Sequence, residues 1–103
     1  MPTNLKLKFT PEAKADLLEI FAYIDKQLSA PVAAVHLIDQ IEHACKRLTA
    51  HPLSCPIPQD DLLAKKGYRM LCVGNFIAFY TADQHQVKIM RVIYGRRNYR
   101  HLL

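Results

Sequence analysis

Residues 68–94 read YRMLCVGNFIAFYTADQHQVKIMRVIY, three apolar, strand-like runs separated by two short polar turns. The runs cover 68–73, 76–82 and 87–94, and the β-branched and aromatic residues in them favour strands. Gly74 and Asn75 form a two-residue turn of the kind that tolerates positive φ, which predicts a hairpin. The polar residues 83–86 supply the second turn. This segment therefore predicts three consecutive strands with mainly antiparallel pairing.

One strand and two helices are expected before this segment. Residues 4–9, NLKLKF, alternate apolar and basic side chains, which is typical of a half-buried strand. Residues 10–12, TPE, combine a hydroxyl cap, a proline at the first helical position and an acid in the first turn. Apolar residues then recur every three or four positions through 13–28, and again through 35–48 after a break at Ser-Ala-Pro. Two helices joined by so few residues are expected to form an antiparallel hairpin.

The expected fold class is α+β, with the order βααβββ and a helical hairpin packed on a mostly antiparallel four-stranded sheet. Residues 51–67 contain three prolines and are expected to form a loop between the hairpin and the remaining strands. The chain has 103 residues, of which 50% are hydrophobic, so it can form one hydrophobic core without disulfide bonds or a structural metal. We expect a single domain that spans residues 1–103.

The positive charge is concentrated in the C-terminal third of the chain. Residues 1–50 carry six bases and six acids, residues 51–64 carry two acids, and residues 65–103 carry eight bases and one acid, which together give the net charge of +5. Such an asymmetry predicts an anionic or acidic partner. The chain also ends on a basic and aromatic stretch, GRRNYRHLL at 95–103.

Several classes of protein are not expected from this sequence. The three cysteines are scattered without a CxxC pair, which is typical of reduced cysteines in a cytoplasmic protein. The sequence contains no apolar run of transmembrane length and no signal-peptide pattern, and we expect no membrane association. It also lacks metal-ligand spacing among its five histidines, a GxSxG motif and a phosphate-binding glycine loop. We therefore expect a protein that uses neither a metal nor a cofactor.

Arginines on the predicted strands are the first candidates for binding an anion. Strand periodicity places Arg69 on the face of Leu71, and it gives Arg91 the parity of Ile89 and Ile93. Guanidinium groups bind phosphate or carboxylate through two oxygens at once, so such a cluster suits an anionic target. The alternative is a set of solvated strand charges.

Three stretches resemble the RelE/ParE superfamily of toxins from bacterial type II toxin–antitoxin systems. They are FTPEAKADLLEIFAYI (9–24), GYR-x-L-x-VGN-x-I-x-FY (67–80) and R-V-x-YGRR-x-Y-x-x-LL (91–103). The resemblance covers nearly the whole chain. It implies a βααβββ fold, which the periodicity predicts independently, and a cognate antitoxin protein that wraps the toxin and blocks it.

The superfamily contains two different activities. RelE-like members cut mRNA in the ribosomal A site, and that resemblance implies Arg69, Arg97 and Tyr99 as catalytic residues that hold the phosphate and act on the 2′-hydroxyl. ParE-like members poison DNA gyrase without being nucleases. Ile77 occupies the position where RelE-like toxins carry another strand arginine, and Tyr99 lies nearer to Arg97 than their terminal tyrosine does.

The long helices, the DLLEIFAYI phrase and the short basic ending are more similar to ParE. This implies DNA gyrase as the target, an arrest of replication and a non-catalytic mechanism. Charge and position select the expected target-binding residues, which are Arg91, Arg96, Arg97, Tyr99 and Arg100. A RelE-like, ribosome-dependent mRNA endonuclease and a non-toxic nucleic-acid-binding module are the alternatives. The antitoxin is expected to offer an acidic, amphipathic or extended segment to the outer side of the helical hairpin and to the basic sheet face.

Overall fold

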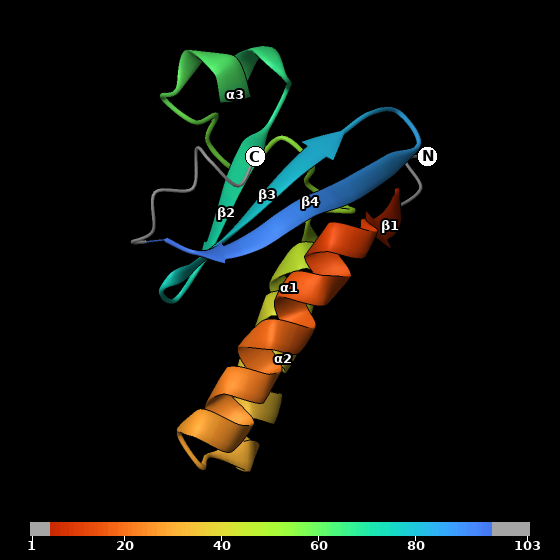
Figure 1. Ribbon diagram of the computed structural model, residues 1–103. Helices are drawn as coiled ribbons and strands as arrows, with labels where there is room; N and C mark the ends of the chain where they lie inside the picture. Colours follow the sequence, from red (N-terminus) through yellow and green to blue (C-terminus); the bar gives the residue numbers. More distant parts are fainter. Residues whose placement is uncertain (1–4, 96–103) are drawn as a thin grey trace.

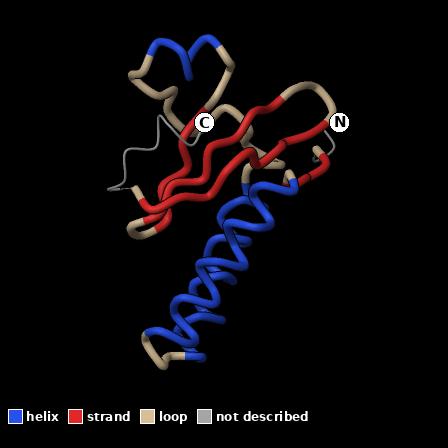
Figure 2. Tube along the Cα trace, in the orientation of Figure 1, coloured by secondary structure: helices blue, strands red, loops and turns tan. Residues whose placement is uncertain are grey.

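The computed structural model describes residues 5–95, and its elements follow the predicted βααβββ order (Figures 1 and 2). The elements are β1 (Lys6–Phe9), α1 (Pro11–Ala22), the π-helical turn η1 (Tyr23–Gln27), α2 (Pro31–Arg47), α3 (Asp61–Lys65), β2 (Arg69–Val73), β3 (Phe76–Ala82) and β4 (Gln86–Tyr94). The α+β class and the helical hairpin on a four-stranded sheet are confirmed. None of the helices within residues 5–95 has the length and apolarity that crossing a membrane requires.

The sheet has the strand order β1-β4-β3-β2. β4 pairs antiparallel with β3, and β3 pairs antiparallel with β2 through the predicted Gly74-Asn75 turn, where Gly74 has φ +57°. β1 pairs parallel with β4, in the register Lys6 with Gln86 through Phe9 with Ile89. The two edge strands are therefore β1 and β2, and β4 lies inside the sheet.

The helical hairpin begins where the sequence predicts it. The hydroxyl oxygen of Thr10 accepts the backbone N–H of Ala13 at 3.0 Å, and Pro11 takes the first helical position. The second helix starts at Pro31, as the break before it indicates. Figure 1 shows α1 and α2 running side by side, with the tip of the hairpin projecting well beyond the sheet.

Two apolar clusters build the core. The hairpin-side core lies between the helices and the sheet, and its largest fully buried side chains include Ile41 from α2, Tyr80 from β3 and Ile89 from β4. The outer core lies on the other face of the sheet and joins Leu63 of α3 to Phe79 and its neighbours Tyr68, Ile77 and Ile93. The outer core thus covers the other face of the sheet around Phe79 and Ile93.

The short helix α3 lies inside the segment that the prolines predict to be a loop. The carboxylate of Asp60 accepts the backbone N–H groups of Leu62 at 2.9 Å and Leu63 at 3.2 Å, which caps the helix. Burial of Leu63 against the outer face of the sheet then holds this single turn in place. The loop prediction is therefore wrong for residues 61–65.

A β-bulge in β4 changes which residues share a face. Arg91 pairs with Phe79, but Ile89 pairs with the next residue of β3, so Met90 is the extra residue in the ladder. Ile89 consequently packs in the hairpin-side core and Ile93 in the outer core. The prediction that Ile89, Arg91 and Ile93 share one face is wrong, because a bulge breaks the period of two.

Candidate functional site

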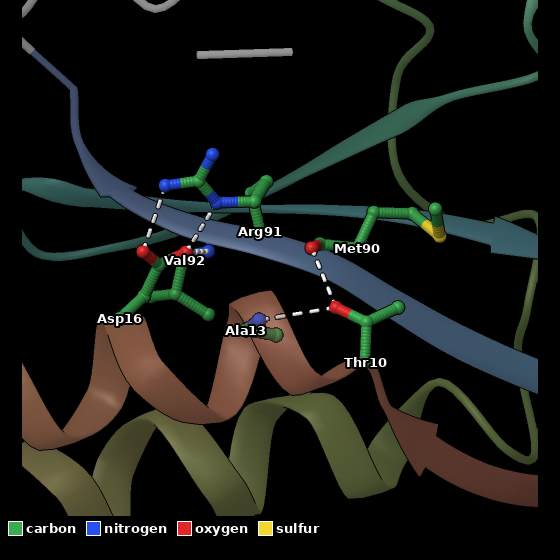
Figure 3. A network of polar contacts seen from close by, with 6 residues as sticks. All are labelled: Thr10, Ala13, Asp16, Met90, Arg91 and Val92. Carbon is green, nitrogen blue, oxygen red and sulfur yellow. Dashed lines mark hydrogen bonds and ion pairs between the residues drawn. The ribbon is translucent and has the colours of Figure 1, made fainter.

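A bidentate ion pair joins α1 to the sheet where β4 leaves the bulge (Figure 3). Arg91 donates from Nε to one carboxylate oxygen of Asp16 at 2.7 Å and from Nη2 to the other at 2.8 Å. The backbone N–H of Val92 donates to the same carboxylate at 2.9 Å. The Asp16 side chain is 8% exposed and the Arg91 side chain 22%, and the hydrogen bond that Arg91 donates to the Asp16 carboxylate raises the pKa of Arg91. A nearly buried carboxylate thus fixes both the side chain of Arg91 and the backbone of β4.

The bulge itself is held by the residue that caps α1. The Thr10 hydroxyl donates to the carbonyl of Met90 at 2.8 Å, and the Thr10 backbone N–H donates to the carbonyl of Ile89 at 3.0 Å. Figure 3 shows this hydroxyl between the Met90 carbonyl and the N–H of Ala13. The start of α1 and the bulge of β4 are therefore fixed to each other.

The end of β4 is held up to the last described residue. Gly95 donates its N–H to the carbonyl of Asn75 at 2.7 Å, and a Cβ at Gly95 would lie 3.2 Å from that oxygen and from the Ile77 side chain. The Tyr94 ring packs edge-on against Phe76, with 5.7 Å between the ring centres. The chain is thus fixed to the turn between β2 and β3 up to Gly95. Four of the predicted site residues, Arg96, Arg97, Tyr99 and Arg100, lie outside the described residues.

Arg69 contacts the proline-rich loop. Its Nη1 donates to the carbonyl of Cys55 at 2.7 Å and to that of Leu53 at 3.4 Å. Tyr80, which pairs with Arg69 across the β2–β3 ladder, donates its hydroxyl to the carbonyl of Pro52 at 2.8 Å. Burial raises the pKa of the Tyr80 phenol well above its ordinary value, so the phenol stays protonated and keeps donating. Together the two side chains hold the loop on the hairpin side of the sheet.

The structure places Arg69 and Arg91 on one sheet, as predicted, and gives them different partners. The guanidinium of Arg69 binds loop carbonyls, whereas that of Arg91 binds the carboxylate of α1. The roles predicted for them in catalysis or target binding stay predictions. Within residues 5–95, no group of three His, Cys, Asp or Glu side chains comes together as a metal site.

Asp16 is a residue of this site that the sequence interpretation missed. It lies one position before Leu17 and three after Ala13, on the apolar stripe of α1. A carboxylate in the buried face of an amphipathic helix needs a partner, so this position was the available signal. No such signal in the sequence indicates that Thr10 forms a hydrogen bond to the bulge.

The sequence matches, over residues 7–99, the family described as "ParE toxin of type II toxin-antitoxin system, parDE". The chain belongs to the ParE toxin family. This places it in the RelE/ParE superfamily and makes it a toxin of the type II toxin–antitoxin class. No significantly similar sequence is found among curated proteins.

Solved structures give the same fold for this ParE-family chain. A chain of the chromosomal ParDE system from P. aeruginosa is 23% identical, with a TM-score of 0.72 over 87% of this chain and 95% of that one. A chain of the toxin–antitoxin complex RelBE2 from Mycobacterium tuberculosis is also 23% identical, with a TM-score of 0.62 over 89% of this chain and 99% of that one. At this identity the two likenesses establish the fold and nothing finer.

Proposed function

We propose that this ParE-family toxin inhibits DNA gyrase and that a cognate antitoxin protein neutralises it. The observation that carries the proposal is the family match over residues 7–99. In the proposed mechanism the toxin binds gyrase in the cytoplasm and stabilises the complex in which gyrase has cleaved DNA, which arrests replication. The toxin itself performs no bond-breaking step.

Two features of the sheet favour a toxin that binds a target protein over one that cleaves RNA at a phosphate. Position 77, where RelE-like toxins carry an arginine, holds an isoleucine that is 8% exposed and packs in the outer core. Arg69, the other strand arginine of that comparison, donates to two loop carbonyls. A ribonuclease site at these positions would lack one cation and would share the other with the loop.

The proposed gyrase-binding surface is the end of β4 and the residues that follow it. It comprises Arg91, Arg96, Arg97, Tyr99 and Arg100. We expect deletion of residues 96–103 to abolish toxicity and to leave antitoxin binding intact, because β4 is held by its own contacts up to Gly95. Loss of both properties together would place the antitoxin on the same segment or indicate misfolding.

The antitoxin is expected to bind the outer side of the helical hairpin. Leu18 of α1 and Val32 of α2 are 71% and 69% exposed, which gives an amphipathic segment apolar side chains to cover. Substituting both with Ser should weaken antitoxin binding by at least tenfold and leave gyrase inhibition unchanged. Unchanged antitoxin affinity would remove this surface from the interface.

The direct test uses the purified toxin with gyrase, ATP and relaxed plasmid, with and without the antitoxin. We expect supercoiling to stop in the presence of toxin and to resume when the antitoxin is bound first. A parallel reaction with ribosomes and mRNA serves as the control. Cleaved mRNA together with normal supercoiling would establish the RelE-like alternative, in which Arg97→Ala should slow cleavage by orders of magnitude.

A further inference from the structure

Three lysines lie on the sheet face that points away from the helical hairpin. Lys6 and Lys8 alternate along β1 with Leu7, which packs against the hairpin-side core. Lys88 alternates in β4 with Val87, which is buried in the same core. Because successive strand residues point to opposite faces, the three lysines share the outer one. We call Lys6, Lys8 and Lys88 the lysine face.

The three side chains are close neighbours. Figure 1 shows β1 beside β4. The two strands pair directly, and Lys8 is in register with Lys88. Lys6 and Lys8 are separated by about 6.6 Å along the strand, and adjacent strands lie about 4.8 Å apart. Like charges opposite each other across a strand pair are destabilising. Folding does not require this arrangement, since any polar side chain would serve at the exposed positions of Lys6 and Lys8 and at the half-buried position of Lys88.

The lysine face has little opposite charge beside it. Among the described residues, Arg91 forms a salt bridge with Asp16, and none of the three lysines is part of it. Asp83, in the turn before β4, lies within electrostatic range of Lys88, but its Oδ1 already accepts the N–H groups of His85 and Gln86 at 2.7 and 2.9 Å. The hairpin segment, residues 11–47, carries six acids and four bases. The charge is therefore polarised, with an excess of acids on the helices and of bases on the opposite sheet face.

Protection of a sheet edge explains only part of this pattern. Lysines are common on edge strands because they discourage pairing with other chains, and Lys6 and Lys8 lie on the edge strand β1. Lys88 lies on β4, between β1 and β3, where no edge needs protection. The third lysine calls for another explanation.

We propose that the lysine face binds the phosphate backbone of double-stranded DNA. Lysine ammonium groups act as point charges that attract phosphate without reading sequence. The neighbours across the ladders are polar, Thr81 beside Lys88 and Gln86 beside Lys6, so the face offers no apolar anchor for a peptide. The next aromatic ring along β3, Phe79, is fully buried and cannot stack on the bases of a single strand. A duplex backbone is the anion that needs neither feature.

This inference goes beyond the proposed function, since inhibition of gyrase does not require the toxin to touch DNA. It also stands apart from it experimentally, because DNA binding is measured without gyrase. A toxin that binds DNA but leaves gyrase active would refute the proposed function alone. A toxin that inhibits gyrase but does not bind DNA would refute only the role proposed for the lysine face.

The experiment measures binding of the full-length toxin to a short duplex of mixed sequence between 50 and 200 mM salt. The test variant combines Lys6→Gln, Lys8→Gln and Lys88→Gln. The control combines Lys14→Gln, Lys26→Gln and Lys46→Gln, three exposed helical lysines, and so removes the same net charge. Circular dichroism checks that both variants are folded.

We expect the test variant to flatten the dependence of log K on log salt by about 2–3, since each phosphate contact contributes about 0.9. Over a fourfold change in salt this is about a 40-fold smaller loss of affinity than the wild type shows. The control should keep the wild-type slope, and Lys88→Gln alone should change it by about 0.9.

Four results would overturn the proposal. Equal flattening in both triple variants would mean that only net charge matters, and an unchanged slope in the test variant would mean that the lysine face makes no phosphate contact. Tighter binding of single-stranded RNA than of duplex DNA, lost in the test variant, would assign the face to RNA. A loss of antitoxin affinity in the test variant with DNA binding unchanged would assign it to an acidic peptide.

Discussion

Replacing Asp16 by Asn should strongly destabilise this toxin. The substitution keeps the shape of the side chain but removes its charge, and it turns one acceptor oxygen into an NH2 group that faces the donors of Arg91. In the wild type the carboxylate accepts three hydrogen bonds, at 2.7, 2.8 and 2.9 Å, and is 8% exposed.

The magnitude follows from the burial of the two partners. Removing one partner of a buried ion pair costs about 3–5 kcal/mol. Arg91 remains 22% exposed, so water compensates part of the loss and we expect about 2–4 kcal/mol. For a domain of this size that corresponds to a fall in Tm of more than about 10 °C.

Chemical denaturation followed by circular dichroism measures the effect, with Asp39→Asn on the exposed face of α2 as the matched control. The control should change the free energy of unfolding by less than about 0.5 kcal/mol. In a double-mutant cycle with Arg91→Met, the double variant should lose about 1.5–3 kcal/mol less than the two single losses summed. A loss at Asp16 no larger than that of the control, or a coupling energy near zero, would refute the reasoning.

Three further predictions concern the strand end, the loop and the buried thiol. Gly95→Ala should lower the free energy of unfolding by about 1–3 kcal/mol, because the new methyl group would press on the Asn75 carbonyl. A variant as stable as the wild type would show that the turn moves without cost. Tyr80→Phe should cost about 1 kcal/mol by removing the hydrogen bond to the proline-rich loop, and limited proteolysis should then cut that loop faster; an unchanged cleavage rate would mean that the bond does not hold the loop. Burial raises the pKa of the Cys45 thiol from 9.0 to about 12, so its contribution to stability is complete below pH 9 and is lost as the pH rises towards 12. Between pH 9 and 12 the free energy of unfolding of the wild type should therefore fall by about 1.4 kcal/mol per pH unit more steeply than that of Cys45→Ala. Equal slopes in the two proteins would contradict the assignment.

The elements of this fold could be predicted from the sequence because each has a local signal. The alternation in residues 4–9, the Thr10 cap and the Gly74-Asn75 turn each specify a backbone conformation without help from distant residues. The structure confirms the cap, the turn and, within the described residues, the strand Lys6–Phe9. The parallel pairing of β1 with β4 could not be predicted in this way. It joins residues about 80 positions apart. The alternation of apolar and polar residues in a strand does not indicate which other strand it pairs with.

The site was less predictable because it is built from long-range contacts. The bulge at Met90 inserts one residue into a regular alternation, and nothing in the apolar run 87–94 marks it. It depends on the Thr10 hydroxyl, which the sequence assigns only to the helix cap. Likewise Arg91 reads as an anion-binding residue from its charge, and its carboxylate partner becomes visible only when α1 is placed against β4. Charge indicates which chemistry a residue favours, but not which partner it finds.

The measurement that tests the central claim most directly is the amount of linear plasmid released by protease from reactions of toxin, gyrase, ATP and relaxed plasmid. Linear DNA reports gyrase that is held on cleaved DNA, which inhibition of ATP turnover alone would not produce. The account predicts that linear DNA increases with toxin concentration and disappears when the antitoxin is bound beforehand. Normal supercoiling without linear DNA, at toxin concentrations that stop growth, would contradict it.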